Sequence, residues 1–314
     1  MRDADLIIVG AGVAGLTAAM FAGRCGLKPV VVEQLGAGGQ IINAERIENF
    51  PGFPQGLGGH ELGPLLHEQA EAVGAEFMLD TVQGLEVQRS DVQALEASGG
   101  QRIVRCAGES LRAPAVIIAA GSALRPLGLA GEETFRGRGV SHCASCDGAF
   151  FAGRDVCVVG GGDSALDEAL VLAEHAARVT VFHRGESLSA QHALQTKAAA
   201  NGKIEIVLRT TVEEIVGAEA VSAVRLRDAA TGAMRLQEVK GVFIYVGLEP
   251  NTAFLRDVLE LDAAGHIVTD IMMRTSLAGV FAAGDIRQHS VAQLAAAAGD
   301  GATAAMSAFR YLQH

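Results

Sequence analysis

Two cysteines with two residues between them are the feature of this sequence with the most direct chemistry. The segment reads Cys143-Ala-Ser-Cys146-Asp147-Gly148, and this spacing places both sulfur atoms on one helical turn. A thiol at the N-terminus of a short helix has a lowered pKa, and the thiolate is the form that attacks a disulfide. Asp147 can move the proton that dithiol exchange requires. We predict that Cys143, Cys146 and Asp147 form a catalytic redox group.

A zinc site is the main alternative for this pair. Zinc requires four ligands, and the sequence has no second Cys-x-x-Cys or suitably spaced His pair, so we expect no metal. The other three cysteines, at positions 25, 106 and 157, have no informative spacing. His142 could tune the redox pair or be a partly exposed bystander.

The elements that position this pair include a strand–glycine turn–helix unit, which occurs twice. In the first copy a strand is predicted over 5–9, a helix over 16–25 and a second strand over 30–33. The glycines of its turn are Gly10, Gly12 and Gly15. In such turns the first glycine permits the bend, the second lets the backbone approach a pyrophosphate, and the third allows close helix–strand packing.

The second copy lies 150 residues further along the chain. Gly10 corresponds to Gly160, Gly12 to Gly162 and Gly15 to Ala165. A single glycine-rich turn would be weak evidence for a ligand, but two copies in register predict two nucleotide-binding units.

The residue after the second strand distinguishes the two units. Glu33 can accept hydrogen bonds from a ribose 2′-OH and would repel a 2′-phosphate, which suits the adenosine end of FAD or NAD. His183 and Arg184 occupy the corresponding place in the second copy and lack that acidic group. The second copy is therefore the predicted nicotinamide site.

Length and composition restrict the class of protein. A chain of 314 residues with 49% hydrophobic residues predicts two globular domains. A net charge of -11, with no long run of Lys or Arg, argues against binding to nucleic acid. No apolar run reaches the roughly 18 residues that cross a bilayer, and no signal peptide is recognised. We expect a soluble, cytoplasmic protein with no membrane partner.

Further segments occur in the order in which the low-molecular-weight thioredoxin reductases carry them. These segments are 38–40, 48–52, 143–148, 161–165, 247–251 and 284–285. With the first glycine turn and its helix they span nearly the whole chain. The sequence therefore resembles that family of FAD-dependent pyridine nucleotide-disulfide oxidoreductases.

The resemblance implies an α/β fold with two Rossmann-like dinucleotide-binding domains, each with a doubly wound parallel sheet. The FAD-binding domain would consist of residues 1–120 and 250–314. The nicotinamide-type domain, which binds NAD(P)H and carries the redox pair, would be inserted between these segments as residues 121–249.

The resemblance also assigns the cofactor-binding residues. Those for FAD are Gly10, Gly12, Ala14, Gly15, Glu33, Gln34, Gly39, Gln40, Asn49, Gly121, Gly284, Asp285, Gln293 and Leu294. Those for the nicotinamide nucleotide, NADH or NADPH, are Gly160, Gly162, Asp163, Ser164, Ala165, His183 and Arg184.

The activity that the resemblance implies is electron transfer to a thioredoxin-like protein. Hydride would pass from the nicotinamide to flavin N5, and the reduced flavin would reduce the Cys143–Cys146 disulfide. Cys146 would face the flavin, and Cys143 would attack the disulfide of the partner protein. In that family the small domain rotates between the half-reactions. The positions of Arg138, Phe150 and Phe151 match those around the thioredoxin docking site. Aromatic residues after a turn are also common in the core, so that alternative stays open for the two phenylalanines. A homodimer is expected.

The sequence departs from the family where the electron donor binds. The family's usual 2′-phosphate clamp has three arginines, whereas here His183 and Arg184 are followed by a glycine, and Glu186 adds a negative charge. If each missing contact contributed roughly 1.5–3 kcal/mol, NADPH affinity would fall by about two orders of magnitude or more. Ala292 also replaces a common arginine beside Gln293. We expect the donor to be NADH, a ferredoxin or another reduced flavin.

Other functions stay open at this point. The same dithiol could work in reverse, as a flavin-dependent dithiol oxidase that passes electrons to oxygen, although Asp147 and Gly148 favour the reductase. A ferredoxin- or flavin-coupled disulfide reductase would retain the dithiol and change only the donor. A low-turnover flavin-binding sensor would fit the altered clamp but not the intact redox group.

Overall fold

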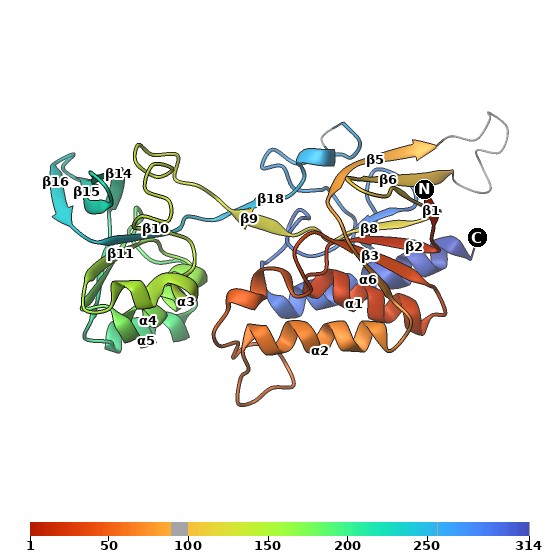
Figure 1. Ribbon diagram of the computed structural model, residues 1–314, viewed down its shortest axis with the longest axis horizontal. Coiled ribbons are helices and arrows are strands. Elements are labelled where there is room, and N and C mark those ends of the chain that lie inside the picture. The colour runs from red at the N-terminus through yellow and green to blue at the C-terminus, as the bar shows by residue number, and fades with distance from the viewer. Residues whose placement is uncertain (89–99, 256, 314) are drawn as a thin grey trace. The chain divides into compact units, whose positions relative to one another are not determined.

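The chain forms two compact units. The structure, a computed structural model, describes residues 1–88, 100–255 and 257–313. Residues 89–99, 256 and 314, which fall in the expected FAD-binding domain, lie outside the described residues. The first unit consists of Met1–Ala123 and Glu249–His314, and the second of Leu124–Leu248. The chain therefore leaves the first unit, builds the second, and returns (Figure 1).

A five-stranded parallel sheet forms the centre of the first unit. Its strands are β2 (Leu6–Val9), β3 (Pro29–Glu33), β4 (Glu76–Leu79), β8 (Val116–Ile118) and β19 (Val280–Ala282). The order across the sheet is β19-β8-β2-β3-β4. β2 lies at the centre, with β3 and β4 on one side and β8 and β19 on the other, which is the Rossmann order. Because the strands are parallel, their carboxyl ends lie at one edge of the sheet.

Both faces of this sheet are covered, which explains its continuous apolar strands. On one face lie the helices α1 (Val13–Arg24), α2 (Gly59–Glu71) and α6 (Leu294–Leu312). On the other lies a sheet of β1 (Arg2–Asp3), β5 (Val82–Gln88), β6 (Gln101–Cys106) and β7 (Leu111–Ala113) (Figure 1). Ile8 packs with the helices, whereas its neighbour Ile7 packs against the sheet of β1, β5, β6 and β7. Successive side chains of β2 thus belong to two different cores.

The second unit repeats this plan. Its parallel strands are β10 (Val140–Ser141), β11 (Asp155–Gly160), β12 (Arg178–Phe182), β13 (Ile204–Val207) and β17 (Gly241–Tyr245). Their order is β10-β17-β11-β12-β13. The predicted α/β fold with two Rossmann-like units, one inserted in the other along the chain, is confirmed.

Helices cover one face of the parallel sheet of the second unit, and an antiparallel meander covers the other. The helices are α3 (Ala144–Asp147), α4 (Asp163–His175) and α5 (His192–Ala200). The meander consists of β14 (Thr210–Gly217), β15 (Val221–Asp228) and β16 (Met234–Glu238). Val158 of β11 packs with α4, whereas Cys157 packs with the meander.

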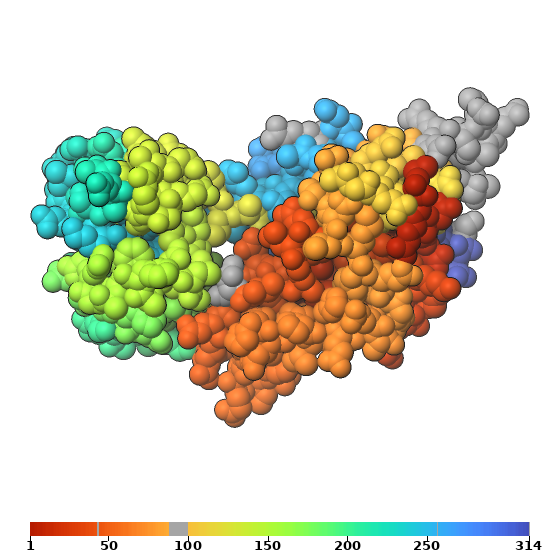
Figure 2. Space-filling view, in the orientation of Figure 1, coloured from red at the N-terminus to blue at the C-terminus, as the bar shows by residue number. Residues whose placement is uncertain are grey.

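Short elements complete the chain. The two crossings between units, β9 (Ser122–Leu124) and β18 (Leu248–Pro250), pair with each other. Three 3₁₀ helices are η1 (Gly39–Asn43), η2 (Gly148–Phe151) and η3 (Ala253–Leu255). Backbone hydrogen bonds between Ile47 and Leu57 close a segment, residues 44–58, that projects beside α2 (Figure 2). None of the helices in the described part of the chain has the length and apolarity needed to cross a membrane.

Candidate functional site

The glycine turn between β2 and α1 has two positions that exclude a side chain. A Cβ atom on Gly10 would lie 2.5 Å from the carbonyl oxygen of Ala119, and one on Gly15 would lie 1.9 Å from that of Gly10. Around the Cβ position of Gly12, by contrast, no other part of the described chain comes within 4 Å. The turn therefore leaves open space over the N-terminus of α1, where backbone amides can bind a phosphate.

Glu33 lies beside this turn at the end of β3. One carboxylate oxygen accepts a hydrogen bond from the Ala11 amide at 2.8 Å, and the other accepts from the amides of Gln34 and Leu35 at 2.9 and 3.0 Å. These bonds fix the carboxylate next to the glycine turn, as a ribose-binding acid requires. Gln34 contributes only its backbone amide, and its side chain is exposed.

The carboxyl end of β19 brings the C-terminal segment to the same edge of the sheet. Gly284 has a φ of 79°, and a Cβ atom there would lie 2.9 Å from the Cβ of Ala14 in α1. The next residue, Asp285, is half-buried, and this burial raises the pKa of its carboxyl, with a smaller contribution from the charge of Asp300. The Ser290 hydroxyl donates to Asp285 at 3.0 Å and opposes that rise.

Two amide side chains connect the remaining residues predicted for FAD. Gln40 donates to the carbonyl oxygen of Ser122, next to Gly121, at 3.1 Å. Asn49 donates to the side chain of Gln293, the N-cap of α6, at 3.0 Å. Gly39 and Leu294 complete the set: Gly39 lies where a Cβ atom would be 3.1 Å from the Cα of Gly12, and Leu294 begins α6.

These features fit the adenine dinucleotide FAD. The space over Gly12, the fixed carboxylate of Glu33 and the half-buried carboxyl of Asp285 lie at the carboxyl ends of β2, β3 and β19 respectively. That is the edge at which Rossmann-type sheets bind their ligands.

The second glycine turn, between β11 and α4, has corresponding geometry. A Cβ atom on Gly160 would lie 2.3 Å from the carbonyl oxygen of Tyr245, whereas the nearest atom to the Cβ position of Gly162 is the Ser189 hydroxyl, 3.7 Å away. Ala165 packs against Gly160 where the first copy has a glycine. The open space again lies over a helix N-terminus.

A cavity of about 610 Å³ opens beside this turn, and all its lining residues belong to the second unit. Its wall includes Gly162, Ser164, His183 and Arg184. Asp163 also lines it, but both of its carboxylate oxygens are engaged by Gln191, at 2.7 and 2.6 Å. The volume and the open helix terminus suit a nucleotide.

The charges near the ribose end of this cavity differ from those of a phosphate clamp. Arg184 is exposed, and Glu186 pairs with Arg209 at 3.3 Å. Glu186 lies two residues from Arg184, which lines the cavity, so its carboxylate adds negative charge close to that wall. Arg209 would have to leave Glu186 to bind a 2′-phosphate.

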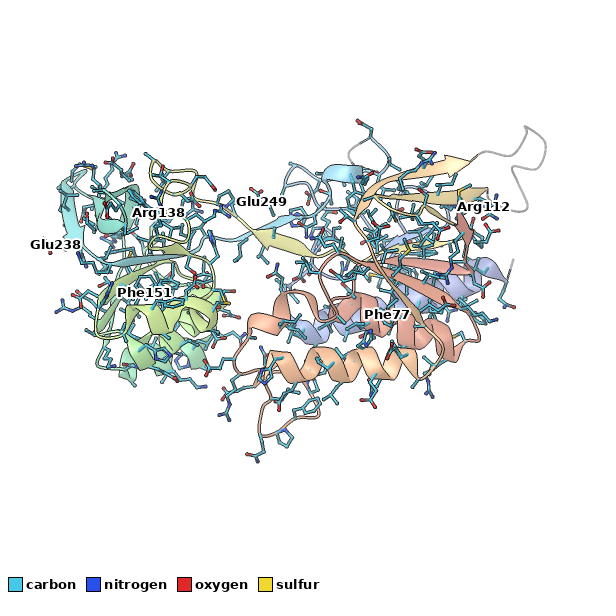
Figure 3. The ribbon with its side chains drawn as sticks, viewed as in Figure 1. Phe77, Arg112, Arg138, Phe151, Glu238 and Glu249 are labelled. Carbon is cyan, nitrogen blue, oxygen red and sulfur yellow. A yellow bond between two sulfur atoms is a disulfide. The ribbon has the colours of Figure 1, made fainter. Side chains whose placement is uncertain are left out.

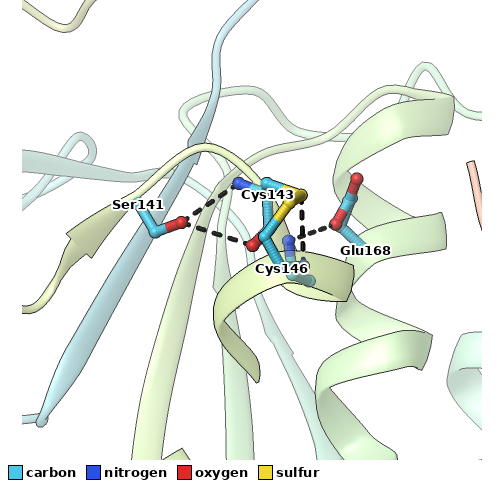
Figure 4. Close-up of a disulfide and its surroundings, with 5 residues drawn as sticks. Ser141, Cys143, Cys146 and Glu168 are labelled. Carbon is cyan, nitrogen blue, oxygen red and sulfur yellow. Dashed lines mark hydrogen bonds between the residues drawn. A yellow bond between two sulfur atoms is a disulfide. The ribbon is translucent and has the colours of Figure 1, made fainter. Parts of the chain in front are cut away.

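Cys143 and Cys146 are joined by a disulfide at the start of α3 (Figure 4). Cys143 is the N-cap of this helix, and its sulfur accepts a hydrogen bond from the Cys146 amide at 3.2 Å. Cys143 is half-buried and Cys146 is exposed. The predicted placement of both sulfurs on one turn is what the structure has, and Asp147 follows as the last residue of the helix.

Two residues that the sequence analysis did not identify hold the backbone around the disulfide. The Ser141 hydroxyl accepts from the Cys143 amide at 3.1 Å, and a carboxylate oxygen of Glu168, in α4, accepts from the Ala144 amide at 2.7 Å (Figure 4). No sequence pattern indicates Glu168, because its contact joins two helices 24 residues apart in the chain.

Burial shifts the pKa of two side chains near the disulfide. The pKa of His142 is lowered, chiefly by burial and then by the charge of Arg136, so the imidazole is mostly neutral at pH 7. The pKa of Tyr245 is raised, by burial first and by the charge of Glu168 second, so its phenol stays protonated. Among the described residues, no group of three or more metal-ligating side chains is found.

Phe150 and Phe151, which follow the redox helix, differ in exposure. Phe150 is 75% exposed. Phe151, labelled in Figure 3, is buried and packs edge-on against Phe243, and their ring centroids are 5.4 Å apart. Phe151 is therefore a core residue, and the expectation that it belongs to an exposed docking surface was wrong. Arg138 is exposed, and its guanidinium donates to the carbonyl oxygen of Thr134.

Two nucleotide-binding turns and a disulfide beside the second of them define a nucleotide-dependent disulfide oxidoreductase. The family model described as pyridine nucleotide-disulphide oxidoreductase matches residues 4–301. The thioredoxin reductase of Listeria innocua serovar 6a is 41% identical over 310 residues, covering 98% of this chain and 94% of that protein. The thioredoxin reductase of Streptomyces coelicolor is 42% identical over 311 residues, with the same coverage of 98% and 94%.

A solved structure agrees with these sequence relatives. The crystal structure of Lactococcus lactis thioredoxin reductase superposes with a TM-score of 0.93 at 38% identity, and 99% of each chain is covered. The chain therefore belongs to the pyridine nucleotide-disulphide oxidoreductase family, among the low-molecular-weight thioredoxin reductases. It is an FAD-dependent oxidoreductase that acts in flavin-based disulfide reduction, with a nicotinamide nucleotide as its second cofactor.

Proposed function

We propose that this chain transfers electrons from NADH, through FAD, to the Cys143–Cys146 disulfide and then to a thioredoxin-like protein. The observation that carries the proposal is the disulfide at the N-terminus of α3, in the same unit as the nucleotide-sized cavity. The first unit would bind FAD and the second the nicotinamide nucleotide, each at its own glycine turn. FAD, when bound, supplies a carrier that accepts hydride and delivers two electrons to a disulfide.

Electrons and protons balance at each redox step on this chain. Two electrons and two protons break the bond between Cys143 and Cys146 and leave two thiols. The Cys143 thiolate attacks one sulfur of the partner's disulfide, which releases a thiolate on the partner and forms a mixed disulfide. Cys146 then attacks Cys143, which restores the internal disulfide and releases the partner as a dithiol. Asp147 is assigned the transfer of protons to and from these sulfurs.

NADH is the proposed donor because of the charges beside the second turn. A 2′-phosphate needs cations arranged around it, and here the Glu186 carboxylate already pairs with Arg209 at 3.3 Å. NADH carries a ribose hydroxyl at that position and requires no such exchange. A higher kcat/KM with NADPH than with NADH would overturn this assignment.

Phe150 is the proposed contact for the partner protein. An aromatic ring that is 75% exposed, four residues after Cys146, is available to anchor a partner near the dithiol. Phe150→Ala should raise KM for a thioredoxin-like protein, yet leave the rate with a small aromatic disulfide unchanged. Equal losses with both substrates would contradict a docking role.

The test of the proposed function is anaerobic reduction of the purified flavoprotein, followed by stopped-flow absorbance. We expect NADH to bleach the flavin quickly and a thioredoxin disulfide to restore the colour. Failure of both nucleotides, with bleaching by a reduced ferredoxin, would indicate a ferredoxin-coupled reductase. Oxygen consumption driven by a dithiol would indicate an oxidase. The homodimer and the cytoplasmic location stay predictions. Analytical ultracentrifugation of the purified protein would test the homodimer.

A further inference from the structure

Two of the backbone amides at the start of α3 donate hydrogen bonds to different acceptors, the carboxylate of Glu168 and the sulfur of Cys143. Glu168 accepts from the Ala144 amide at 2.7 Å, and the Cys143 sulfur accepts from the Cys146 amide at 3.2 Å. Figure 4 shows the carboxylate reaching the helix from α4, close to the disulfide. A negative charge thus lies at the same helix terminus where a Cys143 thiolate would form.

The surroundings of Glu168 strengthen the effect of its charge. Its neighbours in α4, Ala165 and Ala169, are fully buried, and the side chain itself is half-buried. It also lies close enough to the buried phenol of Tyr245 to raise the pKa of that group. In such a place a charge is screened less by water and salt than at an exposed site.

We propose that Glu168 is a positioning residue that holds the redox helix and shifts the Cys143–Cys146 pair toward the disulfide. The hydrogen bond to Ala144 fixes the first turn of α3, and with it the direction of the Cys143 sulfur. The negative charge disfavours a thiolate nearby, so the reduced form is less stable than it would be beside a neutral group. The inference rests on the proposed function, because it concerns the same disulfide.

The test compares Glu168→Gln with Glu174→Gln. In Glu168→Gln the carbonyl oxygen of the new amide side chain can still accept from Ala144, so this variant removes the charge and keeps the contact. Glu174 lies six residues further along α4 and is exposed, so its variant removes the same charge from the same helix at about 9 Å along the axis. His142, Asp147 and Tyr245, the other titratable groups around the pair, are unchanged in both variants.

The holoprotein is equilibrated anaerobically with dithiothreitol buffers, quenched by alkylation, and analysed by peptide mass. At a pH above the pKa of the Cys143 thiol, each reduction takes two electrons from dithiothreitol, which is oxidised to its cyclic disulfide. One of its two protons goes to Cys146 and the other to the buffer, so that Cys143 is left as a thiolate. We expect Glu168→Gln to increase the equilibrium constant for reduction about threefold, or about 14 mV at 29.6 mV per tenfold change. The pKa of the Cys143 thiol, from the pH dependence of its alkylation rate, should fall in the same variant.

The outcomes separate the inference from the proposed function. If Glu168→Gln and Glu174→Gln both match the wild type, the inference is overturned while the proposed function stands. If the wild-type pair does not cycle between disulfide and dithiol, both are overturned. Glu168→Ala also removes the acceptor for Ala144, so it should show the same shift in equilibrium together with slower turnover. Slower turnover without any shift would leave Glu168 a merely structural residue and overturn its effect on the redox equilibrium.

Discussion

Burial and partners decide which cysteines of this chain can react. Burial, with a smaller contribution from the charge of Asp80, raises the pKa of Cys106 to about 11. Burial also raises the pKa of Cys157, which is fully enclosed. Both thiols stay protonated at neutral pH and have low reactivity. Cys143 and Cys146 differ because they are accessible and lie at a helix N-terminus.

Serine substitutions test this difference between cysteines. Cys143→Ser and Cys146→Ser should each reduce turnover with a thioredoxin disulfide by roughly a thousandfold or more, because disulfide exchange has no substitute nucleophile. Flavin reduction by NADH should persist in both, since neither sulfur is needed to bind the nucleotide. The control is Cys157→Ser, which should keep the activity of the folded protein. The measurement is steady-state turnover beside single-turnover flavin bleaching, and loss of bleaching in either variant would contradict the proposed roles.

A single charge reversal tests the electron donor. Glu186→Arg removes a carboxylate two residues from Arg184, which lines the cavity, releases Arg209 and adds a cation. Each new charge-assisted hydrogen bond to a 2′-phosphate contributes roughly 1.5–3 kcal/mol, so kcat/KM for NADPH should rise about tenfold or more. The matched control is Glu205→Arg, at an exposed site on β13 that does not line the cavity. An equal gain in both variants would show a general effect of net charge.

At the scale of elements, each glycine turn combines a structural and a ligand-binding requirement. A side chain on Gly15 would collide with the carbonyl oxygen of Gly10, which holds α1 against β2, whereas one on Gly12 would meet open space. Packing therefore requires glycine at position 15, whereas at position 12 the bound ligand requires it.

Two alanine variants separate these requirements. Gly15→Ala should reduce the free energy of unfolding by about 1–3 kcal/mol, as overpacking typically does. Gly12→Ala should lower the stability of the FAD-free protein by at most about 1 kcal/mol, because alanine is a poorer N-cap than glycine but φ at Gly12 is -73° and no clash arises. It should also lower the amount of FAD bound per chain, because the new methyl group fills the space for the phosphate. Urea unfolding and flavin absorbance per chain are the measurements, and full FAD content in Gly12→Ala would refute the assignment.

The sequence predicted the elements whose patterns are local. Strands over 5–9 and 30–33 correspond to β2 and β3, and the helix expected over 16–25 begins earlier, at Val13, because the turn itself supplies the N-cap Gly12. The offset of 150 residues carried this prediction, since two turns of one design support each other.

What the sequence did not predict depends on contacts between distant segments. The meander of β14, β15 and β16 covers the second sheet, yet its short strands have no motif that indicates a partner. Glu168 looks like any polar residue of a helix, and its function follows only when α3 packs beside it. Phe151 was misplaced for the same reason, because only the folded core shows that it packs on Phe243.

At the scale of the whole molecule, each unit contains its own cores. In the second unit, both faces of the parallel sheet are covered by its own helices and its own meander. In the first unit, α6 from the C-terminal segment packs on α1, so both segments are needed for one core. The chain ends that removal of the second unit would create are close, since the Asn251 amide donates to the carbonyl oxygen of Gly121 at 3.0 Å.

This organisation predicts that each unit folds without the other. A polypeptide of residues 122–250 should unfold cooperatively in urea, and NADH at 100 times its Kd should stabilise it by about 2.7 kcal/mol. A second polypeptide, in which a short Gly-Ser linker joins Gly121 to Asn251, should bind FAD and show no response to NADH. The Gly162→Ala variant of the first polypeptide is the control, because its new methyl group should reduce stabilisation by NADH while the fold persists. A gradual unfolding transition in either polypeptide would mean that the units depend on each other, and stabilisation of the wrong polypeptide by NADH would reverse the assignment of the two nucleotide sites.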